Sequence, residues 1–311
     1  MKELLYRYYL IKLSDYKEDT KDSLYFTIND KKYHFFVVHR DLEEIEDILK
    51  ITDDLLKRNV LIYSPIKNIN GSFITIENNN YYVLLDESGD NKEITLLEII
   101  DFTNKTRIIN NIKSKLYRND WYTLWQEKIN YLEYQVSELG KQYPVIVSSF
   151  SYYRGLSENA LCYVKYLENK NIIKNDNLVI SHQRMHYLEY ANTYLNPFSI
   201  VIDRDLRDIS EYLKSMALEN NNYALIDLKT YMNLRKPSFY EASMLYARLI
   251  FPTYYFDKQE SIINNNDKED DLLKIIIKKD QMEDFLNEAY KIIQKYQPID
   301  EIVWLNKSND L

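Results

Sequence analysis

Two apolar runs in this sequence each lead into residues that could do chemistry. Residues 178–180 precede His182 and, two positions later, Arg184; the stretch 196–208 contains a second run that ends at Asp203. A carboxylate that follows a strand is a good ligand for a divalent cation. A guanidinium stays protonated at any working pH, so Arg184 cannot accept a proton from a substrate. The two runs therefore raise the question of whether these residues form a phosphotransferase site or only its remains.

Phosphate chemistry also needs a loop that can wrap phosphates with bare backbone amides, and such loops depend on glycine. The chain has only four glycines, and they are scattered singly along it. No glycine-rich phosphate loop is therefore predicted. The four positions are Gly71, Gly89, Gly140 and Gly155.

Composition excludes several classes of protein. The chain has 311 residues, of which 45% are hydrophobic and 28% charged, an ordinary balance for a globular protein. A net charge of -8 argues against a general nucleic-acid binder. The single cysteine, Cys162, rules out an intramolecular disulfide, and its apolar neighbours predict a buried thiol. The sequence has no signal peptide and no membrane-spanning run, so we expect synthesis in the cytoplasm and no membrane insertion.

The first 90 residues are predicted to form strands around one long helix. Asp41 is the expected N-cap of that helix, with Glu44 at the capping-box position, and the helix extends to about Arg58. The polar turn 29–32 joins the first two strands. The predicted strands are 24–28, 33–38, 60–66, 72–76 and 81–86.

Helices dominate the rest of the chain. We expect a helix capped by Ser157, another that begins with a capping box at Asp280 and Glu283, and an exposed loop over 257–271. Further helices are predicted at 123–140, 208–218 and 240–251. The layout predicts an α+β protein with two lobes, a small β-rich one (1–88) and a larger helical one (89–311) with a short hairpin at its centre. This is the arrangement of a protein-kinase-like fold, with the hinge near Leu85–Ser88.

Several motifs resemble the spore-coat-associated kinase-like family, the CotS and YutH group, and the YutH branch more closely. They include "SYYRGLSENALCYVKYL" (151–167), "SHQRM" (181–185), "NPFSIVIDRDLRDISEYLKS" (196–215) and "YARLIFPTYYFD" (246–257), of which the first and the last are the more specific. That family belongs to the aminoglycoside and choline kinase-like superfamily. The resemblance implies the aminoglycoside phosphotransferase-like fold and a sporulation context, with other spore coat or sporulation proteins as partners.

The resemblance also implies roles for individual residues. His182 matches the histidine of the catalytic loop, and Arg184 falls where that loop carries its aspartate base. Five residues beyond Arg184 stands Glu189 instead of the metal-binding asparagine. Asp203 matches the metal-binding aspartate. Asn192 or Asn196 could supply the asparagine only if the loop is longer than usual.

The small lobe departs from the family pattern as well. Active relatives place a lysine of one strand on the nucleotide phosphates. The predicted strand 33–38 has no lysine, because Lys31 and Lys32 precede it in the turn. Glutamates that could take the place of its helix partner are Glu43, Glu44 and Glu46.

Structural roles compete with catalytic ones at the residues that remain. His182 is expected to be structural, with hydrogen bonds to backbone near Asp203. The Asp203 carboxylate is either a vestigial cation ligand or a group satisfied by a nearby arginine or backbone amide. The 30 tyrosines either fill half-buried positions or form an interaction surface, for which 149–155 and 252–257 are the candidate stretches.

These losses favour a degenerate kinase-like protein, a pseudokinase that serves as a structural or binding component of endospore coat assembly and requires no cofactor. The alternative is an active phosphotransferase for a small molecule, dependent on ATP and Mg²⁺. A third possibility is a module that binds nucleotide without hydrolysis. In that case the hinge residues Tyr82, Leu84 and Asp86 would hold an adenine through backbone groups.

Overall fold

The computed structural model describes residues 1–13, 17–20, 22–87, 92–108, 113–169, 177–186, 194–265 and 267–305. The chain divides into two compact units. The first contains Met1–Thr95, Asn104–Leu116 and Leu188–Val201, and the second contains Leu96–Thr103, Tyr117–Tyr187 and Ile202–Leu311. A single boundary near residue 88 is therefore too simple, because two later segments pack with the first unit.

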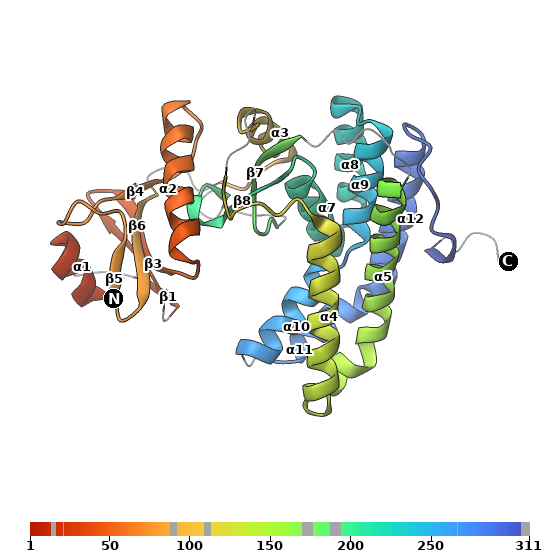
Figure 1. Cartoon of the computed structure of the whole chain (residues 1–311), viewed down its shortest axis with the longest axis horizontal. Helices are drawn as coiled ribbons and strands as arrows, with labels where there is room; N and C mark the ends of the chain where they lie inside the picture. Colours follow the sequence, from red (N-terminus) through yellow and green to blue (C-terminus); the bar gives the residue numbers. More distant parts are fainter. Residues whose placement is uncertain are drawn as a thin grey trace. The chain divides into compact units, whose positions relative to one another are not determined.

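The first unit is built on an antiparallel sheet, as Figure 1 shows. The strands follow the order β1-β2-β3-β6-β4, and β5 pairs with β6. The sheet confirms the β-rich character expected for this part of the chain. Its strands are β1 (Lys17–Thr20), β2 (Ser23–Ile28), β3 (Lys31–Val38), β4 (Ser64–Ile66), β5 (Thr75–Glu77) and β6 (Asn80–Asp86).

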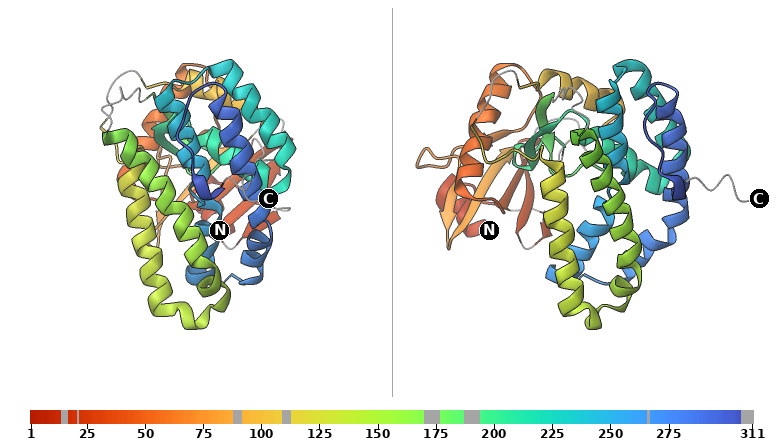
Figure 2. Two further views of the ribbon diagram at one scale, coloured as in Figure 1. Left: turned by 90° about the vertical axis from the view of Figure 1, so that its right-hand side faces the viewer. Right: turned by 45° about the vertical axis from the view of Figure 1, so that its right-hand side comes forward.

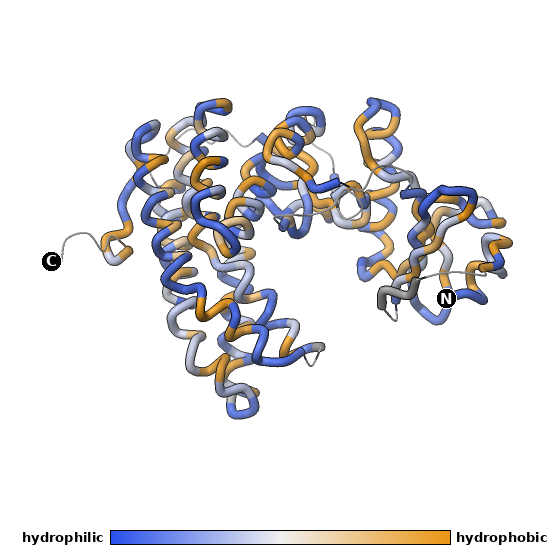
Figure 3. The backbone as a smooth tube through the Cα atoms, turned by 180° about the vertical axis from the view of Figure 1, so that it is seen from behind, coloured by the Kyte–Doolittle hydropathy of each residue, from blue (hydrophilic) through white to orange (hydrophobic). Residues whose placement is uncertain are grey.

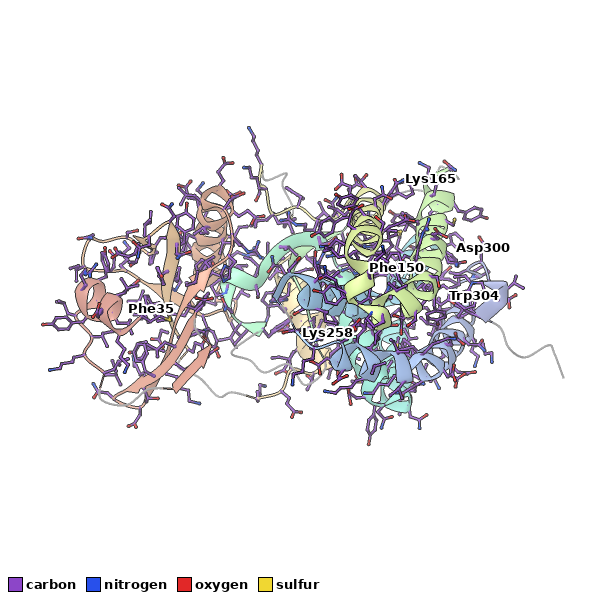
Figure 4. The ribbon with its side chains drawn as sticks, turned by 90° about the horizontal axis from the view of Figure 1, so that it is seen from below. Phe35, Phe150, Lys165, Lys258, Asp300 and Trp304 are labelled. Atoms are coloured by element: carbon purple, nitrogen blue, oxygen red, sulfur yellow. The ribbon has the colours of Figure 1, made fainter. Side chains whose placement is uncertain are left out.

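Strand alternation decides what each face of this sheet buries. Phe35 pairs with Leu24 on β2 and with Leu84 on β6, and all three side chains are fully buried. They form a cluster with Leu5 of the N-terminal helix α1 (Lys2–Tyr9). Figure 4 marks Phe35 on the sheet beside this helix.

The predicted turn and helix of this unit are confirmed, with small shifts in the bounds. Asn29 and Asp30 both have positive φ, as a tight hairpin between β2 and β3 requires. The helix α2 (Leu42–Lys57) begins after Asp41, whose carboxylate accepts the backbone N–H of Glu44. Two strands are shorter or displaced, since β4 covers only the end of 60–66 and β5 begins at Thr75.

The second unit is helical around a two-stranded sheet of β7 (Leu178–His182) and β8 (Ile200–Arg204). Its long helices α4 and α5 lie side by side (Figure 2), and hydrophobic and hydrophilic stretches alternate along the helices in Figure 3. The helices are α3 (Leu96–Lys105), α4 (Trp121–Leu139), α5 (Pro144–Asn169), α7 (Arg207–Glu219), α8 (Asn221–Arg235), α9 (Phe239–Ile250), α10 (Thr253–Asn265), α11 (Asp270–Ile277) and α12 (Lys279–Gln294). The short 3-10 helices are η1 (Gly140–Gln142), η2 (Pro197–Ser199) and η3 (Val303–Leu305).

Two predicted helix starts are wrong. Ser157 lies inside α5, where its hydroxyl donates to the carbonyl of Tyr153 (2.7 Å), a bond that serine readily makes within a helix. The helix α12 has no side-chain cap at its start. The carboxylate of Glu283 instead accepts the hydroxyl of Tyr152 (2.8 Å). A complete capping box is found at Ser238 and Glu241, at the start of α9.

The loop predicted over 257–271 is also wrong, because most of it belongs to α10 and α11. Phe256, Gln259 and Ile262 are buried at helical spacing on α10. The charged residues between them lie on the partly exposed side, and their density concealed the periodicity.

Cys162 is exposed on α5, so the prediction of a buried thiol is wrong. Its apolar neighbours turn inward because helical spacing places them on another face of α5. The stretches 149–155 and 252–257 contribute to the core through their buried tyrosines, since the rings of Tyr153 and Tyr255 stack with centroids 3.7 Å apart. Among the described residues, none of the helices combines the length and the apolar character that crossing a membrane requires.

Candidate functional site

His182 ends strand β7 and is held by a carboxylate of α7. Its backbone N–H donates to Asp208 Oδ1 (2.9 Å), and its ring Nδ1 lies 2.7 Å from Asp208 Oδ2. The ring is buried against the ring of Phe102, with centroids 5.3 Å apart. These contacts favour the structural role expected for His182, although a side-chain carboxylate takes the place of the backbone partner that was predicted.

Asp203, near the end of β8, is fully buried and is surrounded by donors from the protein. Its Oδ1 accepts the indole N–H of Trp121 (2.9 Å) and the backbone N–H of Arg204 (2.7 Å). Its Oδ2 accepts from Nη1 of Arg207 (2.5 Å) and lies 3.1 Å from the same indole nitrogen. Both oxygens of the predicted metal ligand are therefore engaged, one of them by a guanidinium.

Arg207 links the residues around His182 to Asp203. Besides the ion pair with Asp203, its Nε donates to the carbonyl of His182 (2.7 Å) and its Nη2 donates to the carbonyl of Gln183 (2.8 Å). The guanidinium thus joins the end of β7, the following turn and the end of β8. His182 and Asp203, which the sequence predicted to share a site, are brought together through this arginine.

Arg184, at the position of the catalytic base, forms an ion pair with Asp257 of α10. Its Nη2 donates to Asp257 Oδ1 (2.5 Å), its Nε donates to Oδ2, and its Nη1 donates to the carbonyl of Gln183 (2.7 Å). The two-point contact fixes the guanidinium plane. Glu189 lies outside the described residues, so its predicted place in the loop stays a prediction. Asn192 also lies outside them.

Asn196 has a structural place instead. Its side-chain oxygen accepts the backbone N–H of Phe198 (2.9 Å) and caps η2. This bond is local, and it gives Asn196 a role that needs no metal.

Behind the site lies a buried ionic cluster that the sequence analysis missed. Lys214 donates to Glu211 (3.0 Å), to the carbonyl of Phe251 (3.0 Å) and to the hydroxyl of Thr253 (2.8 Å). Arg248 donates to the same carboxylate (3.0 Å). Glu211 and Lys214 are three residues apart on α7, a spacing that could have suggested the pair.

Burial and the charges of neighbouring residues act together on the pKa values of this cluster, in part in opposite directions. Burial lowers the pKa of Lys214 to about 8, although Glu211 opposes the shift. Burial and the positive charge of Arg207 lower the pKa of Arg248 to about 10. Burial raises the pKa of Glu211, but the charges of Lys214 and Arg248 outweigh it and the pKa falls below its usual range. The Arg248 guanidinium also lies 4.6 Å from the ring of Trp121, which connects the cluster to the neighbourhood of Asp203.

In the first unit, β3 carries its two lysines at its first two positions. Lys31 and Lys32 are the first residues of β3 and are exposed, so their placement in the turn was wrong. The α2 glutamates that could have paired with a lysine of β3 lie near other cations instead. Glu44 lies 3.6 Å from Arg40, and Glu43 lies 2.9 Å from Lys115.

The middle of β3 carries a histidine packed between aromatic rings. His34 Nε2 lies 2.7 Å from the Ser23 hydroxyl, and its Nδ1 lies 3.1 Å from Glu87. The rings of Tyr25 and Phe36 stack on the imidazole, with centroids 3.9 and 4.3 Å away. The same glutamate acts on Tyr63, since burial and the charge of Glu87 raise the pKa of the Tyr63 hydroxyl to about 12. Where an active kinase-like fold presents a lysine to phosphate, this strand is filled by aromatic side chains and a buried histidine.

The three predicted hinge residues lie within β6. Tyr82 pairs with β3 and β5, while Leu84 and Asp86 pair with β3 and β4. Because both neighbours on the sheet use their backbone groups, an adenine would have to bind after this strand. Adenine binding stays a prediction, and Ser88 lies outside the described residues.

Comparisons with known proteins identify the family and the fold of this chain. The model of the family described as "Spore coat putative kinase YutH" matches residues 2–289. The endospore coat-associated protein YutH of Bacillus subtilis (strain 168) is 28% identical over 210 residues, which cover 61% of this chain and 62% of that protein. The chain thus matches somewhat less than two thirds of this relative's length.

Solved structures share the fold at low sequence identity. An aminoglycoside phosphotransferase from Alicyclobacillus acidocaldarius has a TM-score of 0.61 at 11% identity, over 91% of this chain and 93% of the other. A spectinomycin phosphotransferase in complex with ADP and spectinomycin has a TM-score of 0.61 at 12% identity, over 94% and 97%. The choline kinase LicA of Streptococcus pneumoniae has a TM-score of 0.52 at 11% identity, over 95% and 98%. The kinase-like fold expected from the sequence is confirmed.

Proposed function

Because this chain belongs to the spore coat YutH family, we propose that it is a degenerate kinase-like protein that acts as a structural or binding component of endospore coat assembly. The observation that carries the proposal is the state of Asp203. Its carboxylate is fully buried, and a guanidinium lies 2.5 Å from one of its oxygens.

A magnesium ion does not fit this arrangement. Mg²⁺ needs carboxylate lone pairs at about 2.1 Å and nearly octahedral geometry. At Asp203 those lone pairs already accept from Trp121, Arg204 and Arg207. A cation could bind only by displacing the guanidinium, which would leave two positive charges close together at a buried position. We therefore propose that the protein requires neither Mg²⁺ nor ATP.

The catalytic loop gives the same indication. Arg184 cannot accept a hydroxyl proton, and its ion pair with Asp257 fixes it in place. Asp205, which could replace the base, is buried and lies 2.8 Å from Arg235. Neither the base position nor its possible replacement therefore offers a group that is available to accept a proton.

The surviving residues support the fold instead. Arg207 and Asp208, both on α7, hold the ends of β8 and β7 through Asp203 and His182. A polar network whose members are satisfied by one another makes a buried region rigid. A rigid module suits a protein that works by binding others, and we propose other coat proteins as its partners.

Association with the spore coat is proposed from kinship. The Bacillus subtilis relative is endospore coat-associated, and the match covers 62% of its length. We propose that this chain is made in the cytoplasm and then joins the coat.

The alternative function is phosphoryl transfer from ATP to a small molecule. It is favoured by the fold and by the positions of His182 and Asp203, which match the family's motif. It requires that Arg207 leaves Asp203 when a nucleotide and a metal bind. A residue outside the described part of the chain, such as Glu189, would then have to serve as the base.

A thermal-shift titration separates the two functions. Purified protein is titrated with ATP, ADP and GTP, each with and without Mg²⁺ or Mn²⁺, because a ligand that binds only the folded state raises the melting temperature. We expect no shift at millimolar nucleotide. A metal-dependent shift that Asp203→Ala abolishes would overturn the proposal and favour phosphoryl transfer.

A further inference from the structure

The N-terminal helix has one face in the core, and another part of it carries large apolar side chains that are exposed. Leu5 is fully buried in the cluster around Phe35, whereas Tyr6 is 59% exposed. Leu10, directly after the helix, is 70% exposed. In Figure 3 this helix carries both orange and blue turns. Its outer side therefore presents large apolar side chains to solvent.

Leu10 also has an unusual backbone. Its φ of 57° and ψ of 25° are left-handed. Its N–H donates to the carbonyl of Tyr6 (3.1 Å), and the N–H of Ile11 donates to the carbonyl of Leu5 (3.3 Å), which ends α1. Glycine is the usual residue at such a helix end, because a side chain there is strained. The leucine gains little packing from its own unit in return, since most of its side chain is exposed. A side chain that strains the backbone without packing inside its own unit suggests that it contacts another molecule.

A groove runs along this side of α1. Its volume is about 520 Å³, and it has both apolar and charged walls. Next to it, the backbone N–H of Ile69 donates to the carbonyl of Tyr8 (2.8 Å), and the Ile69 side chain is 57% exposed. We name this surface the α1 groove; its lining residues are Lys2, Glu3, Tyr6, Arg7, Ile11, Lys12 and Leu13.

The charge of the α1 groove is opposite to that of the whole chain. Three cationic side chains and one carboxylate line it, while the net charge of the protein is -8. Glu77 engages one of the cations, Arg7, at 2.7 Å, and that pair also fixes one wall. Lys12 is exposed at the other end. An occupant with carboxylates therefore fits better than a cationic one.

We propose that the α1 groove binds an acidic segment of a partner protein. In this segment, an apolar side chain packs against Tyr6 and Leu10, and flanking Asp or Glu side chains meet Lys12 and its neighbours. The proposal deepens the proposed function, since it rests on a binding role and names the chemistry of the partner. Peptide binding to the groove does not depend on Asp203. The nucleotide titration therefore tests the proposed function, and the peptide experiment tests the groove separately.

The test uses the full chain and a library of random displayed peptides. Peptides are selected on the wild type, and the affinity of the best ones is measured by fluorescence polarisation. We expect sequences with an apolar residue flanked by carboxylates. Leu10→Gly and Lys12→Glu should each weaken binding by about ten-fold or more, as truncation of an interface anchor does. Binding should also weaken as salt is raised.

Leu10→Gly has a second readout that excludes misfolding. Because glycine accepts the left-handed conformation, this variant should melt at a higher temperature than the wild type even while it loses the peptide. Leu61→Ser is the matched control, since Leu61 is 71% exposed on the same unit but, unlike Leu10, does not adjoin a lining residue of the groove in the chain. It should leave the affinity unchanged.

Four results would overturn the proposal. One is selection of peptides without carboxylates, and another is binding that neither groove variant weakens. A third result is that no peptide is selected and the protein instead sediments with phosphatidylglycerol vesicles, unless it carries Leu10→Gly. That result would assign the groove to a lipid surface. Self-association lost in the same variant would assign it to a second copy of the chain.

Discussion

Replacement of Arg207 by methionine removes the guanidinium from the kinase-like site while it keeps much of the side-chain volume. The change takes away the ion pair with Asp203 at 2.5 Å and the bonds to the carbonyls of His182 and Gln183. Trp121 and a backbone N–H still donate to the carboxylate. A buried negative charge is then left without its cation, in a place from which water is excluded.

The expected loss of stability follows from burial. Asp203 has no exposed surface, and the Arg207 side chain is 8% exposed. Breaking such a pair by removal of one partner costs about 3–5 kcal/mol. We therefore expect the free energy of unfolding to fall by that amount. Urea denaturation followed by tryptophan fluorescence measures it, and an unchanged dependence on urea would indicate that only stability changed.

Two further variants make the result specific. Arg154→Met breaks the pairs with Glu133 (2.6 Å) and Glu158 (3.0 Å), in which all side chains are at least 41% exposed, and should cost about 1 kcal/mol or less. Adding Asp203→Asn to Arg207→Met removes the stranded charge and should restore about 2 kcal/mol. If Arg207→Met costs no more than Arg154→Met, or if Asp203→Asn restores nothing, the account of the site is refuted.

Three other predictions follow from the same structure. Lys214→Met removes one of the two cations that hold the buried carboxylate of Glu211, and Arg248 remains. The free energy of unfolding should fall by about 1.5–3 kcal/mol in urea denaturation, as loss of a hydrogen bond to a charged group does; a loss below about 1 kcal/mol would contradict the cluster. Gly155→Ala should raise the stability by about 0.5–1 kcal/mol, since Gly155 lies within α5 and a methyl group there meets open space; destabilisation in the same assay would show that the space is used. Burial raises the pKa of Tyr246, and that of Tyr255 to about 12, so the unfolded chain loses these protons near pH 10 before the folded chain does. The melting temperature should therefore stay constant up to about pH 9 and then fall. Above the pKa of the unfolded chain, the free energy of unfolding should fall by about 1.4 kcal/mol per tyrosine and pH unit. A melting temperature that stays constant to about pH 11 would disprove the buried state of these rings.

The fold was largely predictable because its strongest signals are local. The turn at Asn29 and Asp30 and the N-cap at Asp41 depend on residues adjacent in sequence, and both are confirmed. The failures have a common cause. Ser157 and Glu283 looked like cap residues, but tertiary contacts give them other partners.

The candidate site was predictable in its residue types but not in its connections. The sequence identified His182, Arg184 and Asp203, and their chemistry could be argued from side-chain type alone. The partners Asp208 and Asp257 come from helices 26 and 73 residues further along the chain. Such distances carry no periodic signal, so only the folded chain reveals these two partners. The pair between Asp203 and Arg207 spans only four residues, and a nearby arginine was one of the partners expected for Asp203.

The central claim is that Asp203 does not bind a metal, because Arg207 occupies its carboxylate. Electron paramagnetic resonance of Mn²⁺, titrated into the wild-type protein with ATP, tests it most directly. We predict only the signals of free Mn²⁺ and of Mn²⁺ bound to free ATP. A protein-bound Mn²⁺ signal that disappears in Asp203→Ala would contradict the account and return the protein to the active kinases.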